Sequence, residues 1–374
     1  MDVGVGIVGY GLMAKAHTFG YRNASAFGSL AAKPKVVAMS GRNPVALAAA
    51  AALYGVPDTT SDWRTLLDRD DVDVIDICTP PGTHAEIAIA AAAAGKAVIC
   101  EKPLAASFAD ALAATRAVED SGVANAVGFN YRRLPALALL QRLIADGRIG
   151  RVLTWHATWF TDEFADPEIP FDWRFDLAMG ASTFADLGSH LIDLALTQVG
   201  PVDAVSAQTQ TTIAERSGQA VTVPESCSAL LRFASGASGV IDLARNAVGR
   251  PCDFVVDVSG TEGSLRFDYA RLNELWFSHI DDDPELYGPR RIRAEHTTHP
   301  YSANWWPIGQ GVGYGSSFVN QVVAWFAEWP PKTWDPDFAQ GTRVQAICDA
   351  MERSSLSDHW EQVPTFDLNP ANKL

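Results

Sequence analysis

The chain has 374 residues, of which 48% are hydrophobic and 20% are charged, and its formal net charge is −15. This length predicts two domains, and the composition is that of a globular protein with a sizeable core. The excess of acidic residues argues against binding to nucleic acid or to an anionic membrane, because both need clustered Lys and Arg. No apolar stretch is long enough to cross a bilayer. The five cysteines are scattered without a Cys-x-x-Cys pair, which argues against a disulfide framework or a zinc site and predicts a cytoplasmic protein.

The first 128 residues alternate short apolar segments with alanine-rich segments, a pattern typical of a parallel sheet with helical crossovers. Since the first apolar segment starts so near residue 1, no signal peptide is expected. Helices are predicted at 44–55 and 83–95, and each ends at a glycine, as helices often do. We therefore expect a doubly wound, Rossmann-type α/β domain over residues 1–128. Its predicted strands are residues 5–9, 35–40, 72–78, 97–100 and 124–130.

From residue 151 onward the predicted strands are longer and are joined by glycine-centred turns, which is typical of antiparallel hairpins. A helix is predicted at 183–200 and another at 336–354, while residues 281–310 have the composition of a long loop. The second domain, residues 129–374, is therefore expected to be α+β, with a large, mostly antiparallel open sheet. Its predicted strand segments are 151–160, 201–212, 227–248 and 252–269.

The segment after the first predicted strand carries a dinucleotide-binding fingerprint. Gly9-x-Gly11-x-x-Ala14 directly follows an apolar strand and opens a helix. The first glycine of this motif makes a tight turn, the next lets the backbone approach a pyrophosphate, and the final small residue lets the helix pack closely on the sheet. The pyrophosphate then lies at the helix N-terminus. The predicted cofactor contacts in this turn are Gly9, Gly11, Leu12 and Met13.

The end of the second predicted strand bears on the choice between NAD and NADP. NAD-binding folds usually carry Asp or Glu there, to bind the ribose 2′-hydroxyl. This chain has Gly41-Arg42 instead, flanked by Ser40 and Asn43. A guanidinium in place of a carboxylate favours a 2′-phosphate, so the sequence predicts NADP(H) over NAD(H), with Ser40 and Arg42 as contacts. Alternatively, Arg42 stacks on the adenine or points into water.

Two further groups of residues carry chemistry. Lys102 follows the predicted strand 97–100, at the carboxyl end of a central parallel strand, where open α/β sheets bind ligands. Asp186 and His190 lie four residues apart on the predicted helix 183–200, so they share one face. From this spacing alone three interpretations stay open: a metal site, a structural His–Asp pair, and a catalytic pair in which His190 accepts a proton. No further group with convincing ligand geometry accompanies the pair, so no metal is predicted.

Taken in order, these motifs resemble the Gfo/Idh/MocA oxidoreductase family over nearly the whole chain. Among its members, the pattern is most similar to bacterial sugar and cyclitol dehydrogenases, such as those acting on inositol and levoglucosan. The segments that carry the resemblance are 6–17, 77–105, 129–133, 185–196 and 341–354. The resemblance implies a catalytic set of Lys102, Asp186 and His190. It also implies cofactor contacts at Thr79, Pro80, His84, Glu101, Lys102, Asn130, Trp173 and Arg174.

The activity that the resemblance implies is NAD(P)-dependent oxidation of a secondary ring hydroxyl of a sugar, anhydrosugar or cyclitol, or reduction of the corresponding ketone. His190 would remove the hydroxyl proton while Lys102 donates a hydrogen bond to the oxygen. Asp186 would orient the substrate or the imidazole, and Tyr131 is a further predicted substrate contact. Two alternatives remain: redox-neutral glycoside cleavage or epimerisation through a transient keto-sugar, and a non-catalytic cofactor sensor. The open face of the second sheet needs burial, so a homodimer or homotetramer is expected.

Overall fold

The computed structural model describes residues 1–331 and 334–367. It divides into two compact units. The first contains Met1–Asn130 and Gly315–Gln345, with the described residues from Thr365 onward, and the second contains Tyr131–Tyr314 and Ala346–Pro364. The second domain was expected to contain all residues after 128, whereas Gly315–Gln345 folds with the first unit.

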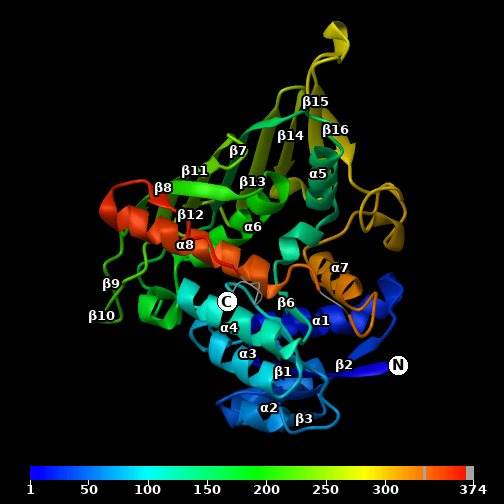
Figure 1. Ribbon diagram of the computed structural model, residues 1–374, viewed down its shortest axis with the longest axis vertical. Coiled ribbons are helices and arrows are strands. Elements are labelled where there is room, and N and C mark those ends of the chain that lie inside the picture. The colour runs from blue at the N-terminus through cyan, green and yellow to red at the C-terminus, as the bar shows by residue number, and fades with distance from the viewer. Residues whose placement is uncertain (332–333, 368–374) are drawn as a thin grey trace. The chain divides into compact units, whose positions relative to one another are not determined.

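The first unit is built on a six-stranded sheet in the order β3-β2-β1-β4-β5-β6, and all of its strand pairs are parallel (Figure 1). The strand order reverses direction between β1 and β4, which is the point where doubly wound sheets bind their ligands. Residues Val3, Val5 and Ile7 are fully buried, as expected for a strand covered on both faces. This sheet confirms the predicted Rossmann fold. Its strands are β1 (Asp2–Val8), β2 (Lys33–Ser40), β3 (Asp58–Thr60), β4 (Val74–Ile77), β5 (Ala97–Cys100) and β6 (Asn125–Val127).

The helices of this unit are stabilised by a side-chain cap on α2 and by close packing of α7 on α1. The side chain of Asn43 accepts hydrogen bonds from the backbone N–H groups of Val45 and Ala46, each at 3.1 Å, and so caps α2. Helix α7 was not predicted from the sequence. It packs on α1 so closely that a Cβ on Gly20 would lie 2.9 Å from the carbonyl oxygen of Phe318. The helices are α1 (Leu12–Phe27), α2 (Pro44–Tyr54), α3 (His84–Ala93), α4 (Phe108–Ser121) and α7 (Gly315–Trp325).

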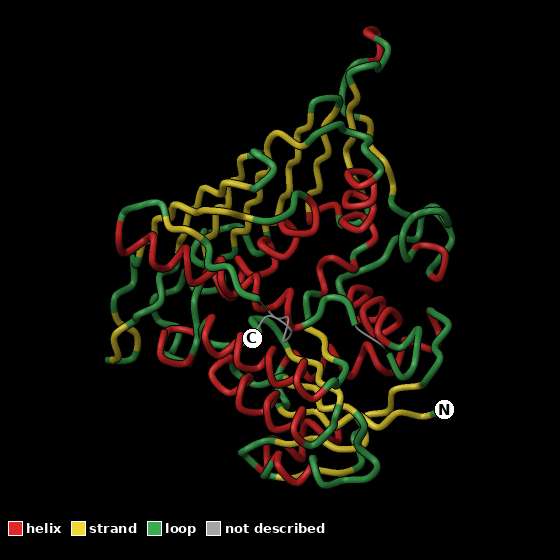
Figure 2. The backbone as a smooth tube through the Cα atoms, viewed as in Figure 1, coloured by secondary structure: helices red, strands yellow, loops and turns green. Residues whose placement is uncertain are grey.

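The second unit is built on a nine-stranded sheet in the order β16-β15-β14-β13-β7-β12-β11-β8-β17. Its strands are drawn in yellow in Figure 2. Strands β7 and β12 are parallel, and every other neighbouring pair is antiparallel, which confirms the predicted open sheet. The strands are β7 (Val152–Phe160), β8 (Val202–Gln210), β11 (Ser226–Phe233), β12 (Ser238–Ala244), β13 (Asp253–Gly260), β14 (Gly263–Asp268), β15 (Glu274–His279), β16 (Arg290–Arg293) and β17 (Glu361–Gln362). A separate small hairpin pairs β9 (Glu215–Arg216) with β10 (Gln219–Ala220).

Part of the segment predicted as a loop, residues 281–310, forms the edge strand β16. That prediction was wrong there because β16 has the sequence Arg-Arg-Ile-Arg and is mostly exposed, so it lacks the apolar alternation of a buried strand. Charged side chains are common on edge strands, where they discourage pairing with another chain.

Burial alternates along the long strands of the second sheet, so one face lies against the core and the other is more open. The helices of this unit are α5 (Pro135–Ala145), α6 (Ser189–Gln198) and α8 (Phe338–Ser357), and α8 starts in the first unit. Helix α5 packs on β14, β15 and α6. Within the described residues, no helix combines the length and the apolar character needed to cross a membrane.

Candidate active site

The predicted cofactor residues of the first unit all follow the carboxyl ends of its parallel strands. Since these ends meet at one edge of the sheet, the fold brings together residues that are far apart in the sequence. Gly9, Gly11, Leu12 and Met13 follow β1, and Arg42 follows β2, whose last residue is Ser40. Thr79, Pro80 and His84 follow β4; Glu101 and Lys102 follow β5; and Asn130 follows β6.

The turn after β1 has the geometry that the fingerprint predicts. Gly9 has a φ of +117°, and a Cβ at this position would lie 2.5 Å from the carbonyl oxygen of Cys78, so only glycine fits. Gly11 is the N-cap of α1, without a capping side chain, and a Cβ there would meet nothing within 4 Å. There is thus open space beside Gly11 at the start of α1, where the unpaired N–H groups of a helix's first turn suit a pyrophosphate. Leu12 is 72% exposed beside this space.

The first residue after β2 is packed against the Tyr10 ring. A Cβ on Gly41 would lie 2.1 Å from the Tyr10 ring, so an Asp or Glu cannot occupy this position without moving Tyr10. The side chain of Ser40 is buried, and its backbone oxygen accepts a hydrogen bond from Gly9 N–H at 2.8 Å. Arg42 is exposed, whereas Asn43 is engaged in capping α2.

The loop after β4 is held by a buried histidine. The ring nitrogens of His84 lie 2.9 Å from the carbonyl oxygen of Pro103 and 2.8 Å from that of Thr79. Burial lowers the pKa of His84. Its side chain therefore joins the Thr79–Pro80 loop to the turn after Lys102, and both of its nitrogens face the backbone of the chain itself.

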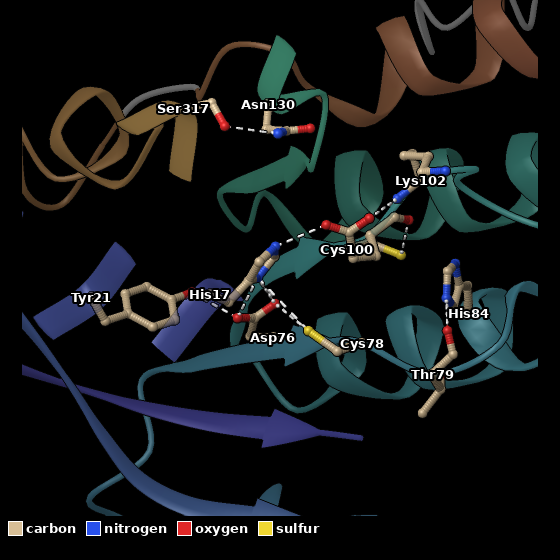
Figure 3. Close-up of polar contacts among 11 residues, drawn as sticks. His17, Tyr21, Asp76, Cys78, Thr79, His84, Cys100, Lys102, Asn130 and Ser317 are labelled. Atoms are coloured by element: carbon tan, nitrogen blue, oxygen red, sulfur yellow. Dashed lines mark hydrogen bonds and ion pairs between the residues drawn. The ribbon is translucent and has the colours of Figure 1, made fainter. Parts of the chain in front are cut away.

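Lys102 follows a strand end that a buried polar network holds in place (Figure 3). His17, on α1, has Nδ1 2.8 Å from Asp76 Oδ2 and Nε2 2.8 Å from Glu101 Oε1. Tyr21 donates its hydroxyl hydrogen to the same Asp76 oxygen at 2.9 Å. The other oxygen of Glu101 accepts a hydrogen bond from the backbone N–H of Lys102 at 3.1 Å. The Glu101 side chain thus supports the strand end from within the sheet.

Ligand atoms of His17, Asp76 and Cys78 lie within 4.8 Å of one another, which is close enough to test for a metal. The hydrogen bonds of His17 and Asp76 to each other, to Tyr21 and to Glu101 satisfy these side chains without an ion. Burial raises the pKa of the Cys78 thiol to about 12. The donor set therefore fits a hydrogen-bonded cluster better than a metal site.

Asn130 follows β6, the strand at one edge of the six-stranded sheet. Its amide donates a hydrogen bond to Ser317 Oγ at 2.8 Å, and the Asn130 side chain is buried. Because Ser317 lies on α7, this contact links the end of the first 130 residues to the segment that returns to the first unit.

In the second unit, Asp186 lies in a π-helical turn, Phe184–Gly188, that continues into α6, where His190 is the second residue. The helix predicted at 183–200 is thus present, although its first turn is wider than an α-helix; such turns are frequent at functional sites. His190 is buried, and its ring centroid lies 4.7 Å from that of Tyr131 and 5.7 Å from that of Trp159. Burial raises the pKa of Tyr131 well above its ordinary value, so the Tyr131 side chain beside His190 is uncharged.

Asp186 has charged neighbours that the sequence analysis missed. Arg245, directly after β12, is buried, and its Nη1 lies 3.9 Å from Asp186 Oδ2. Its guanidinium also lies 4.7 Å over the ring of Phe164. Burial and the charge of Asp186 raise the pKa of Glu163. Glu163 is therefore a second carboxyl group near Asp186. No local signal identified Arg245, because the strand end that carries it is far from Asp186 in the sequence.

Two further groups of residues in the second unit have clear local structures. Asp193 forms a buried ion pair with Arg132, whose Nε donates to Asp193 Oδ2 at 2.8 Å, so this carboxylate is structural. Trp173 and Arg174 lie in a 3-10 turn, and the Arg174 guanidinium lies 4.7 Å over the Trp173 ring. Both belong to the second unit, and their contact with a cofactor stays a prediction.

Family models match both halves of the chain. The NAD-binding Rossmann fold of an oxidoreductase family matches residues 3–129, and the GFO/IDH/MocA C-terminal domain matches residues 137–266.

Relatives of known name extend this match to nearly the full length. Levoglucosan dehydrogenase of Pseudarthrobacter phenanthrenivorans is 38% identical, over 97% of this chain and 98% of its own. Inositol 2-dehydrogenase of Rhizobium meliloti is 31% identical, over 72% of this chain and 77% of its own. A solved structure of levoglucosan dehydrogenase in complex with NADH and levoglucosan has a TM-score of 0.95 at 38% identity and covers 98% of this chain and 100% of its own. The chain therefore belongs to the Gfo/Idh/MocA family of oxidoreductases, with that family's NAD-binding Rossmann fold in its first half.

Proposed function

We propose that this protein is a nicotinamide-dependent dehydrogenase that oxidises a secondary ring hydroxyl of an anhydrosugar, sugar or cyclitol. The observation that carries the proposal is the near full-length likeness to a structure solved with both NADH and levoglucosan. The open helix N-terminus at Gly11 and the strand-end position of Lys102 support it, because they suit the pyrophosphate and the reacting end of such a cofactor.

The proposed catalytic set is Lys102, Asp186 and His190. When bound, the nicotinamide supplies the acceptor for the hydride that leaves the carbinol carbon. His190 takes the hydroxyl proton, and Lys102 donates a hydrogen bond to the oxygen as negative charge develops on it. Asp186 binds a substrate hydroxyl or orients the imidazole. Tyr131, which packs on the His190 ring, is the further proposed substrate contact.

The cofactor turn is proposed to hold the dinucleotide through the backbone of Gly9–Leu12, with Met13, Thr79 and Pro80 lining the same edge of the sheet. We further propose that NADP(H) is preferred, because the exposed Arg42 follows β2 and Tyr10 leaves no room for a carboxylate at position 41.

Replacing Arg42 with alanine is expected to lower kcat/KM for NADP⁺ by about 10- to 100-fold, because a charge-assisted hydrogen bond to the 2′-phosphate is lost. The value for NAD⁺ should change by no more than about threefold, since that cofactor has no 2′-phosphate. Initial rates with each cofactor measure both values. A wild-type enzyme that prefers NAD⁺, with an Arg42→Ala variant that matches it on both cofactors, would contradict the assignment.

The function itself is tested by near-ultraviolet absorbance of the purified protein with NAD⁺ or NADP⁺ and a panel of levoglucosan, cyclitols and pyranosides. Growth of the reduced-nicotinamide band with one ring class is the expected result. Substrate consumption without net change in that band would instead support redox-neutral cleavage or epimerisation. Cofactor binding with no turnover of any ring alcohol would support a sensor.

A homodimer or homotetramer is proposed as the working form. The more open face of the nine-stranded sheet supports this, since it carries the exposed Leu230 of β11 and, opposite it on β12, the half-buried Val240, which association would cover.

A further inference from the structure

We propose that His17 is a positioning residue which, through Glu101, fixes the backbone of Lys102 in the orientation that the reaction needs. This inference rests on the proposed function, in which Lys102 acts on the substrate oxygen.

His17 connects three elements of the first unit. It lies on α1, six residues after the N-cap Gly11, and it reaches the ends of two neighbouring strands at once. Its Nδ1 lies 2.8 Å from Asp76 Oδ2 on β4, and its Nε2 lies 2.8 Å from Glu101 Oε1 directly after β5. One ring therefore ties the cofactor helix to the two strands that carry the Thr79 loop and Lys102 (Figure 3).

The partners of the His17 ring determine its charge. A neutral imidazole donates through only one nitrogen, whereas both nitrogens of His17 face carboxylate oxygens. Asp76 also accepts from the Tyr21 hydroxyl, and the second oxygen of Glu101 accepts from the Lys102 N–H. Burial alone would lower the pKa of His17, but the charge of Asp76 raises it well above the ordinary value. The geometry thus describes an imidazolium held between two carboxylates.

The cluster of His17, Asp76 and Glu101 is shielded from water. His17 is 2% exposed, Asp76 is 0% exposed and Glu101 is 3% exposed. The rings of Phe318 and Trp325, from α7, pack on His17 with centroid distances of 5.9 and 6.4 Å. Burying three charged groups is costly, and their mutual hydrogen bonds offset that cost only while all are present. Such a network is stiff, and a stiff support is what a reacting side chain requires.

Glu101 connects this cluster to Lys102. Glu101 uses one oxygen for His17 and the other, at 3.1 Å, for the Lys102 N–H. On the far side of Lys102, the Pro103 oxygen lies 2.9 Å from His84. Two buried histidines, His17 and His84, therefore support the backbone on either side of Lys102. His17 acts through Glu101 and links Lys102 to α1, the helix whose N-terminus is the proposed pyrophosphate site. A shift of the Lys102 backbone would move its ammonium away from the substrate oxygen.

The test compares His17→Gln and Glu101→Gln with the wild-type enzyme, using levoglucosan or whichever ring alcohol of the absorbance panel reacts best. Each variant is expected to lose about 10- to 100-fold in kcat, because misplacement of a reacting group by about 1 Å costs this much. The KM for the ring alcohol and the dissociation constant of NADH, measured by fluorescence, should stay within about threefold. The double variant should be no worse than the worse single one, because both changes break the same link.

Tyr21→Phe is the matched control, since Tyr21 bonds only to Asp76 in this cluster and not toward Lys102. It should lower the melting temperature but leave kcat unchanged. If His17→Gln does not fold, Glu101→Gln decides the question alone. The glutamine keeps one side-chain oxygen as an acceptor, and residue 101 is the one that contacts both His17 and the Lys102 N–H.

Three results would overturn the inference: an unchanged kcat in the folded variants, a loss confined to NADH binding, or one equivalent of metal bound to the wild-type protein and absent from His17→Gln. Lys102→Met, assayed alongside, separates this failure from failure of the proposed function. An active Lys102→Met variant would contradict both the proposed function and the role of His17. An inactive Lys102→Met variant beside a fully active His17→Gln variant would contradict only the role of His17.

Discussion

Replacing Lys102 with methionine is expected to lower kcat by about 10²- to 10³-fold, the usual cost of removing a preorganised donor from a developing oxyanion. Methionine keeps the length of the side chain but loses its charge and its N–H donors. The effect should fall on kcat, with the dissociation constant of NADH within about threefold of the wild-type value. Steady-state kinetics and NADH fluorescence titration measure the two quantities.

Lys96 supplies the control, because it precedes the same strand, β5, that Lys102 follows. Its ammonium donates to the carbonyl oxygens of Arg69 and Val72 at 2.9 and 2.8 Å, so it is a structural lysine. Lys96→Met should lower stability and spare kcat. Equal kcat losses in the two variants would mean that the loss reflects strand disruption and not chemistry.

Replacing His190 with glutamine is expected to lower kcat by about 10²- to 10⁴-fold, because the substrate hydroxyl then has no general base. Glutamine fills much of the same space beside Tyr131 and Trp159, so the wall of the site should persist. NADH binding should be unaffected, since the fingerprint and strand ends lie in the first unit. Steady-state rates and the same fluorescence titration are the measurements.

His156, an exposed histidine on β7 of the second unit, is the matched control for His190. Its replacement by glutamine should leave kcat and KM unchanged. A His190→Gln variant that turns over as fast as this control would remove His190 from the catalytic set.

The sequence predicted both sheets because their patterns are local. Alternation of apolar and alanine-rich segments marks a parallel sheet, and the glycine pair at Gly9 and Gly11 marks its dinucleotide turn. Strand ends could be located in the same way, so Lys102 was placed at the carboxyl edge of the sheet, where the structure has it. The direction of a side chain at a strand end is not a local property. The sequence therefore did not show that Glu101, His84 and Asn130 turn toward the protein interior and bond to His17, to backbone oxygens and to Ser317.

The residues that were missed owe their positions to packing between distant segments. His17 is the final residue of the fingerprint segment 6–17, where an isolated histidine on an alanine-rich helix was the available signal. Its partners Asp76 and Glu101 are 59 and 84 residues away. Arg245 reaches Asp186 in the same manner, from the end of another strand. Helix α7 was missed because its apolar residues face α1, and nothing in its neighbourhood of the sequence indicates that partner.

The return of residues 315–345 to the first unit determines how this protein can be dissected. A fragment that stops at Asn130 would lack Phe318, Val322 and Trp325, and would leave the α1 surface around Gly20 and Tyr21 open to water. Such a fragment is expected to aggregate when produced alone, because a large apolar surface would be exposed. A stand-alone cofactor module would need residue 130 joined by a short linker to residue 315 and would also have to omit Ala346–Pro364, because both segments of the second unit are removed only in that way.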